Sequence, residues 1–134
     1  MHEYYIELPF PPTVNSYYTK TQRGVYISKR GRTFRDEVAH ACREQNIYGL
    51  RLDQPLSMDV ILYPPDARTR DLDNYMKALL DALTQAEVWT DDHIIDTLTA
   101  HRGAKTPHGA CWVRLRDHHG FIVPHTAQVW DHIE

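Results

Sequence analysis

Residues 56–86 of this chain read LSMDVILYPPDARTRDLDNYMKALLDALTQA, and this stretch decides the predicted fold. In residues 56–63 apolar and more polar side chains alternate, which predicts a strand with one buried face. Two prolines end it, because proline has no place in a central ladder. Residues 72–86 then predict an amphipathic helix with apolar positions at helical spacing. These positions are Leu72, Met76, Leu79, Leu80 and Leu83.

The sequence before this stretch predicts one further strand and one further helix. Residues 3–8 alternate as a strand, and a polar loop with a short extended piece at residues 25–27 follows. The helix begins either after Ser28, as an N-cap, or near Thr33, because Gly31 weakens the earlier start. It ends at about residue 46.

The sequence after it predicts two more strands, residues 92–101 and 111–116, joined as an antiparallel hairpin. The order is strand, helix, strand, helix, strand, strand. This predicts an α/β (α+β) fold, with a mixed sheet of about four strands and two helices packed against it. We expect one domain at residues 1–116 and a C-terminal tail at residues 117–134.

Composition places the chain among ordinary globular proteins, with 42% hydrophobic and 25% charged residues among 134. No apolar run approaches the ~20 residues that span a bilayer, and the N-terminus does not resemble a secretion signal. Cys42 and Cys111 are far apart and form no C-x-x-C pair. We therefore expect a cytoplasmic protein with reduced thiols.

The net charge and the local charges lead to different expectations about binding to nucleic acid. The formal net charge is −3, which disfavours binding to phosphate. Residues 17–35 nevertheless contain no acid. Their cations are Lys20, Arg23, Lys29, Arg30, Arg32 and Arg35. This segment is either a surface that follows a nucleic-acid backbone or an ordinary solvated helix start and hairpin.

Asp71 and Asp73 lie two residues apart, between a basic loop and the start of the predicted helix. Carboxylates are hard oxygen ligands suited to magnesium, and Arg68, Arg70 and Lys77 are placed to attract a polyanion. The alternative is structural. Aspartate is a favoured N-cap, and Asp73 with Lys77 is an ordinary i,i+4 pair.

A second acidic pair, Asp91 and Asp92, opens the strand that follows the helix. A strand–helix–strand crossover returns this strand to the same sheet, so one of the two aspartates is expected near Asp71 and Asp73. Three converging carboxylates repel one another unless a cation neutralises them. The sequence therefore predicts a site for a divalent metal.

These motifs in combination resemble the RusA family of Holliday-junction resolvases, over most of the chain. The resemblance rests on Leu8-Pro9-Phe10-Pro11-Pro12, Asn15, Tyr17-Tyr18, Arg70-Asp71-Leu72-Asp73-Asn74, Lys77, Asp81-Ala82-Leu83, Trp89 and Asp91-Asp92.

The resemblance implies a crossover-junction endodeoxyribonuclease that acts as a homodimer on four-way DNA junctions. It implies Mg²⁺ as the cofactor, with Mn²⁺ as a substitute. By motif position, Asp71, Asp73 and Asp92 match the metal ligands, and Lys77 matches a catalytic lysine. The expected nucleic-acid contacts are Thr13, Asn15, Ser16, Lys20, Arg23, Arg68, Arg70 and Asn74.

Two other functions stay open from the residues alone. One is a metal-dependent phosphoesterase acting on another nucleic acid or on a nucleotide. The other is a non-catalytic junction-binding protein whose acids only cap helices and balance charge. Loss of cleavage without metal separates the enzymes from the binder.

Overall fold

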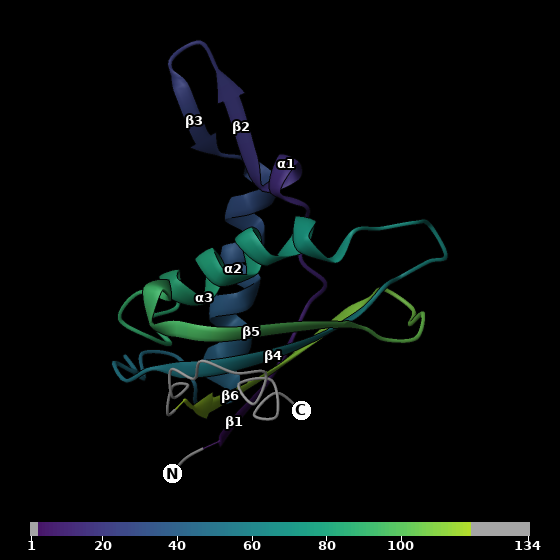
Figure 1. Ribbon diagram of the computed structural model, residues 1–134. Helices are drawn as coiled ribbons and strands as arrows, with labels where there is room; N and C mark the ends of the chain where they lie inside the picture. The colour runs from purple at the N-terminus through teal and green to yellow at the C-terminus, as the bar shows by residue number, and fades with distance from the viewer. Residues whose placement is uncertain (1–2, 119–134) are drawn as a thin grey trace, which may run out of the picture.

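The computed structural model describes residues 3–118 of the chain (Figure 1). A four-stranded sheet and a separate two-stranded hairpin are combined with helices. The elements are β1 (Glu3–Leu8), α1 (Val14–Tyr17), β2 (Tyr18–Thr21), β3 (Gly24–Ile27), α2 (Lys29–Glu44), β4 (Leu56–Tyr63), η1 (Leu72–Tyr75), α3 (Met76–Gln85), η2 (Asp92–Ile94), β5 (Ile95–Arg102) and β6 (Ala110–Asp117).

The main sheet is mixed, in the order β1-β6-β4-β5, which confirms the predicted fold class. β4 and β5 are parallel neighbours, as expected for a strand–helix–strand crossover. The predicted hairpin of the last two strands is wrong, because β6 pairs with β1 and β4. β6 buries Cys111, Val113 and Leu115, which suits a central strand, whereas β5 is more polar and forms an edge.

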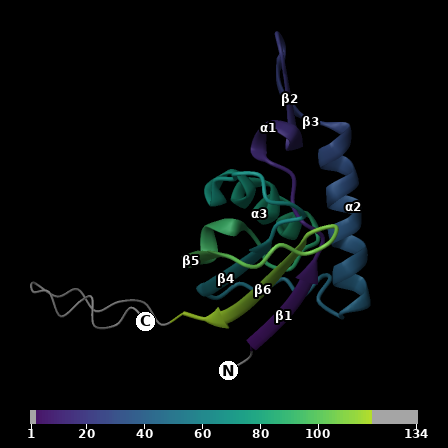
Figure 2. The ribbon, with the colours of Figure 1, turned by 90° about the vertical axis from the view of Figure 1, so that its right-hand side faces the viewer.

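One face of the sheet carries the helices and the core (Figures 1 and 2). Alternate residues of β1, β4 and β6 point to this face and are buried. Phe34 and Val38 of α2 and Leu79 and Leu83 of α3 are fully buried with them. Within residues 3–118 no helix lies on the opposite face, which exposes Tyr5 and Trp112.

The outer edge of β1 is closed by a side chain from the end of α2. The amide of Gln45 accepts a hydrogen bond from Glu7 N at 2.8 Å and donates one to Glu7 O at 2.8 Å. A glutamine thus replaces a neighbouring strand at this residue. Such devices limit the tendency of an exposed edge to pair with another chain.

α2 begins at the earlier of its two predicted starts. Ser28 is its N-cap, and Ser28 Oγ accepts a hydrogen bond from Gly31 N at 2.9 Å. Gly31 does not weaken this start. It permits a close contact, because a Cβ there would lie 2.3 Å from Tyr17 O and 2.7 Å from Ile27 Cγ1. The polar loop expected before the extended piece at residues 25–27 instead contains α1 and β2.

Both cysteines are buried and free, as expected. Burial raises the pKa of Cys42 to about 11 and that of Cys111 to about 12. Among residues 3–118, no helix combines the length and the apolar character required to cross a bilayer. Except for Asp117 and His118, the predicted tail lies outside the described residues.

We predict that Gly31→Ala lowers the free energy of unfolding by about 1–3 kcal/mol, because the added methyl must displace backbone at Tyr17. Urea denaturation measures the change. Thr33→Ala, at an exposed position of the same helix, is the control and is expected to change stability by less than about 0.5 kcal/mol. Equal stability of the two variants would contradict the close packing of α1 on α2.

Candidate active site

Asp71 precedes η1 in extended backbone, with φ −91° and ψ 128°. It occupies the N-cap position, yet its side chain makes no capping hydrogen bond. The first acid of the pair is therefore not used as a cap. It is exposed to solvent and available to an external ligand.

Asp73 lies within η1, and Lys77 lies in the first turn of α3. Both side chains are exposed. No ion pair joins them in the described part of the chain, although they have i,i+4 spacing. The structural alternative for these two residues, a helix-surface ion pair, thus has no support in the geometry.

The neighbours Asp91 and Asp92 have different surroundings. Asp91 Oδ1 accepts a hydrogen bond from Asp92 N at 2.8 Å, and Asp91 Oδ2 lies 3.0 Å from Nδ1 of His93. The hydrogen bond to His93 and then that from the Asp92 backbone lower the pKa of Asp91. Asp91 is engaged locally as the cap of η2, which leaves Asp92 as the exposed acid without such a role.

The two acidic segments lie at the two ends of the crossover between β4 and β5. η2, which begins with Asp92, packs against α3, and η1, which holds Asp73, packs against β5. Burial raises the pKa of the Tyr18 phenol, and the charges of Asp81 and, more weakly, Asp92 raise it further. Asp92 thus belongs to a segment that packs against α3, the helix that carries Asp81.

The acids do not form a closed metal cage. Within residues 3–118, no three His, Cys, Asp or Glu side chains lie close enough to hold an ion together. The predicted gathering of Asp71, Asp73 and Asp92 around one cation thus stays a prediction. Their chemistry fits a hard divalent ion, since all three are exposed carboxylates and neither Asp71 nor Asp73 has a protein partner among the described residues.

The basic loop before the acids is organised by Asp66. Its carboxylate lies 2.8 Å from Arg70 Nη1 and 3.2 Å from Arg68 Nε. Hydrogen bonds from Arg70 and then Arg68 hold the pKa of Asp66 well below its usual range. The Arg70 side chain is only 12% exposed, and its guanidinium lies 5.7 Å from the centre of the Phe10 ring. Arg70 thus braces the loop, while Arg68 remains exposed.

A family model described as Endodeoxyribonuclease RusA matches residues 9–114. This range includes the basic loop, η1, α3 and η2. The chain belongs to the RusA family. It is 36% identical over 121 residues to the crossover junction endodeoxyribonuclease RusA of Enterobacteria phage HK97, covering 87% of this chain and 97% of that protein. It is 40% identical to the enzyme of the same name from Enterobacteria phage 82, and 39% to that of Escherichia coli K12. Each match covers 69% of this chain and 76% of the relative.

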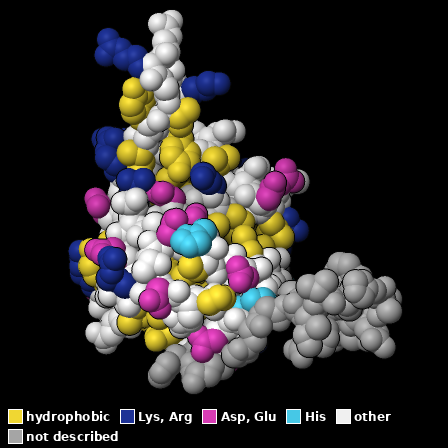
Figure 3. Space-filling view, turned by 60° about the vertical axis from the view of Figure 1, so that its left-hand side comes forward, with side chains coloured by type: hydrophobic (Ala, Val, Ile, Leu, Met, Phe, Trp, Pro, Cys, Tyr) yellow, Lys and Arg dark blue, Asp and Glu magenta, His cyan; other side chains and the backbone are white. Residues whose placement is uncertain are grey.

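In this RusA-family chain, the first part of the basic segment projects from the body as the β2–β3 hairpin, and its last four cations lie on α2. Lys20 and Arg23 are exposed on it, and Lys and Arg side chains flank the projection in Figure 3. Thr13 Oγ1 caps α1 by accepting a hydrogen bond from Ser16 N at 3.3 Å. Asn15 and Ser16 are exposed beside it, and Asn74 is exposed next to Asp73. Every predicted DNA contact except Arg70 and Thr13 is thus an exposed side chain.

A part-buried network ties the base of this hairpin to α3, the helix that carries Lys77. The Tyr17 hydroxyl donates a hydrogen bond to Asp81. Arg35 reaches Asp81 Oδ2 from Nη2 at 2.8 Å and Tyr17 OH from Nε at 2.8 Å. Burial, and then the bond to Asp81, raises the pKa of Tyr17. Three helices, α1, α2 and α3, are fixed together at this point.

From the sequence alone, Arg35 is only one of the cations of residues 17–35, Tyr17 belongs only to the motif of the family, and Asp66 has no role. A signal exists for Asp81, which follows Asp73 and Lys77 at successive four-residue steps and so continues their helix face. No local rule pairs it with Arg35, which is 46 residues away. Asp66 and Arg70 lie in a loop, where i,i+4 spacing predicts no contact.

We predict that Tyr17→Phe lowers the free energy of unfolding by about 1–2 kcal/mol, because the Asp81 carboxylate loses a part-buried donor. Chemical denaturation measures it. Tyr26→Phe is the matched control, since the exposed Tyr26 hydroxyl bonds only to a hairpin carbonyl, Arg23 O at 3.2 Å. A larger loss in the Tyr26 variant would show that the network does not hold the helices together.

Proposed function

We propose that this chain is a magnesium-dependent endonuclease that resolves four-way DNA junctions by paired, symmetric nicks. Membership of a family whose relatives are named crossover junction endodeoxyribonucleases supports this function. The observation that carries it is the exposed acidic set on η1 and η2, in which Asp71 and Asp73 have no described protein partner.

Asp71, Asp73 and Asp92 would hold the Mg²⁺, for which Mn²⁺ is a substitute. When bound, such an ion polarises a phosphoryl oxygen and lowers the pKa of a coordinated water. The three side chains supply only hard oxygen atoms and a formal charge of −3, which suits a dication that also contacts phosphate. Asp91 is left out of this set, because His93 and the backbone of η2 already use its carboxylate.

Lys77 would stabilise the charge that develops on the phosphoryl group or on the leaving oxygen. It is exposed and one helical turn after Asp73, so it lies on the same side of the helix. With no partner among the described residues, its ammonium is free to approach a phosphate. An ammonium fixed on a helix acts as a preorganised electrostatic group.

DNA would approach along the hairpin and the loop beside α1. Lys20 and Arg23 would contact the backbone of one arm, with Thr13, Asn15 and Ser16 nearer the acids. Asn74 and the exposed Arg68 would bind close to the cut. Arg70 supports this surface by bracing the loop, since its guanidinium is mostly enclosed by Asp66 and Phe10.

A homodimer accounts for paired cuts. A four-way junction has near two-fold symmetry, and a C₂ dimer presents two identical sites with the same symmetry. Each copy would then cut one of two opposed strands.

Incubation with a synthetic mobile four-way junction, with and without Mg²⁺, tests the proposal. Paired nicks at symmetric positions, dependent on the metal, are expected. Equal cutting of flaps and linear duplexes would instead indicate a general phosphoesterase. Junction binding without any cleavage would indicate a non-catalytic binder.

We predict that Asp71→Asn, Asp73→Asn and Asp92→Asn each reduce cleavage at least about 100-fold, because each removes a charged oxygen ligand. Junction binding, measured by gel shift, is expected to persist, since the substitution reduces repulsion of phosphate.

Asp91→Asn is the matched control for the adjacent acid. Asparagine is as good a helix cap as aspartate, so this variant is expected to retain cleavage within a few-fold of the parent. Full activity in Asp92→Asn, with loss in Asp91→Asn, would reverse the assignment of the third ligand.

A further inference from the structure

The turn between β5 and β6 belongs to a second acid-free segment of the chain. Residues 97–116 contain no aspartate or glutamate. Their Lys and Arg side chains are Arg102, Lys105, Arg114 and Arg116. The last two bind Asp59 on β4, at 2.8 Å and 3.2 Å. The first two are exposed and have no acidic partner within residues 3–118, so the turn carries two unneutralised positive charges.

The β5–β6 turn is held against the stretch that leads from β4 to the acids. Gly103 N, directly after β5, donates a hydrogen bond to Leu62 O at 2.7 Å. Further along the turn, Thr106 N donates one to Pro64 O at 2.8 Å. The backbone of the turn is thus attached at two points to the start of the loop that ends at Asp71.

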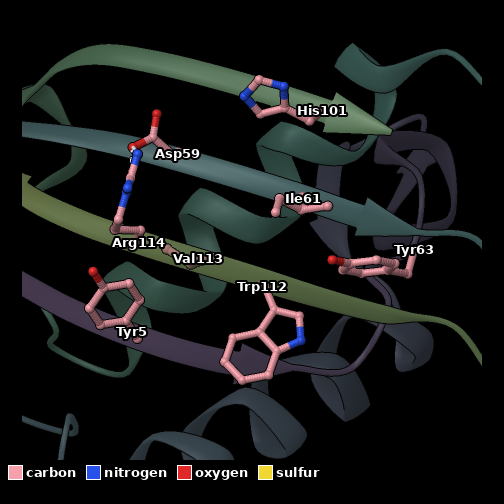
Figure 4. Close-up of a pocket in the computed structure, with 8 residues that line it drawn as sticks. All are labelled: Tyr5, Asp59, Ile61, Tyr63, His101, Trp112, Val113 and Arg114. Atoms are coloured by element: carbon pink, nitrogen blue, oxygen red, sulfur yellow. Dashed lines mark hydrogen bonds and ion pairs between the residues drawn. The ribbon is translucent and has the colours of Figure 1, made fainter. Parts of the chain in front are cut away.

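Strand alternation directs Arg102 toward the side of the sheet that carries the helices. Its neighbour His101 lies on the opposite face, with Ile61 and Trp112 (Figure 4). Successive side chains of a strand point to opposite faces. Arg102 also pairs in register with Leu62, whose side chain is buried in the core. Arg102 is therefore on the same side of the sheet as η1 and α3.

The guanidinium of Arg102 reaches the peptide group directly before Asp71. Arg102 Nη2 donates a hydrogen bond to Arg70 O at 2.7 Å, and this oxygen belongs to the peptide that joins Arg70 to Asp71. An arginine side chain has several N–H donors, and this bond uses one of them. Since the structure gives Arg102 no other side-chain bond within residues 3–118, its remaining donors are available to an anion beside the first acid.

The hairpin and the turn are attached at two different points of the acidic segment. The base of the β2–β3 hairpin bonds to Asp81 on α3, whereas Arg102 bonds directly before Asp71. These aspartates are 10 residues apart, or ~15 Å at the rise of a helix. Asp73 and Lys77 lie between them. In Figure 1 the hairpin projects at the top, and the turn lies at the right-hand end of the sheet.

We propose that Arg102, with Lys105 beyond it in the turn, binds backbone phosphate of the DNA junction at the end of the acidic segment away from the β2–β3 hairpin. A guanidinium pairs with phosphate through two parallel hydrogen bonds, which require a fixed orientation. The bond to Arg70 O supplies this orientation, so less side-chain freedom is lost on binding. The inference rests on the proposed function for its substrate, and it adds a second cationic surface.

A brace for the loop is the alternative role for Arg102. A brace requires only an N–H donor to the Arg70 carbonyl, whereas a phosphate contact requires the positive charge. Arg102→Gln keeps an N–H donor and removes the charge. Arg102→Lys keeps both a donor and the charge. The two variants therefore separate the roles.

The test is binding of the full-length protein to a synthetic four-way junction with a fixed branch point, measured by fluorescence anisotropy over a range of salt concentrations without divalent metal. Loss of one phosphate contact lowers the slope of log affinity against log salt by ~0.9, which weakens binding about 8-fold at 0.1 M salt relative to 1 M. Arg102→Gln is expected to show both changes. Arg102→Lys is expected to stay within about two-fold of the parent.

Arg43→Gln is the matched control. Arg43 is exposed in the last turn of α2, which packs against β1, the edge of the sheet opposite β5. This variant is expected to bind as the parent does. Circular dichroism shows whether each variant is folded.

Junctions with single neutral methylphosphonate linkages around the branch point identify the phosphate. One linkage is expected to weaken binding of the parent without weakening Arg102→Gln further. Parent-like affinity and salt slope in Arg102→Gln, equal losses in the Gln and Lys variants, an equal loss in Arg43→Gln, or the absence of such a linkage would overturn the inference.

The binding measurements do not depend on cleavage. A parent that binds the junction but does not cut it contradicts the proposed nuclease activity and leaves the role of Arg102 in place. A parent that does not bind the junction contradicts both.

Discussion

The parallel pairing of β4 with β5 is the constraint on which the rest of the structure depends. Parallel neighbours cannot be joined by a tight turn, so the chain must leave the end of β4, cross the sheet as η1 and α3, and return. This path places Asp71 and Asp73 at one end of the crossover and Asp92 where β5 begins. The proposed chemistry depends on this connection, because it sets Asp71 and Asp92, 21 residues apart in sequence, beside elements that both pack against α3.

Other contacts fix the hairpin and the sheet edge to the strand–helix–strand unit of β4, α3 and β5. The network of Tyr17, Arg35 and Asp81 fixes the basic hairpin to α3, so a cationic arm and an acidic site keep a set relation. Gln45 closes the outer edge of β1. Among the described residues, the helices bury one face of the sheet and no helix lies on the other.

Much of the fold follows from local sequence pattern. The predictions that are wrong or incomplete concern contacts between residues distant in sequence. Alternation and helical spacing locate β1, β4 and α3, and the capping preference of Ser28 gives one of the two starts that the sequence allows for α2. Strand neighbours do not follow from order alone, which is why β6 was expected beside β5. The acidic motif identifies candidate ligands, but the engagement of Asp91 by His93 and of Arg70 by Asp66 depends on side-chain geometry in loops.

The central claim is that Asp71, Asp73 and Asp92 share one divalent cation. Crystals of the protein soaked in Mn²⁺ test it most directly through anomalous scattering at the metal. The account predicts one anomalous peak per chain, with all three carboxylates within coordination distance and Asp91 still bound to His93. A peak held without Asp92, or a peak at another surface of the molecule, would contradict it.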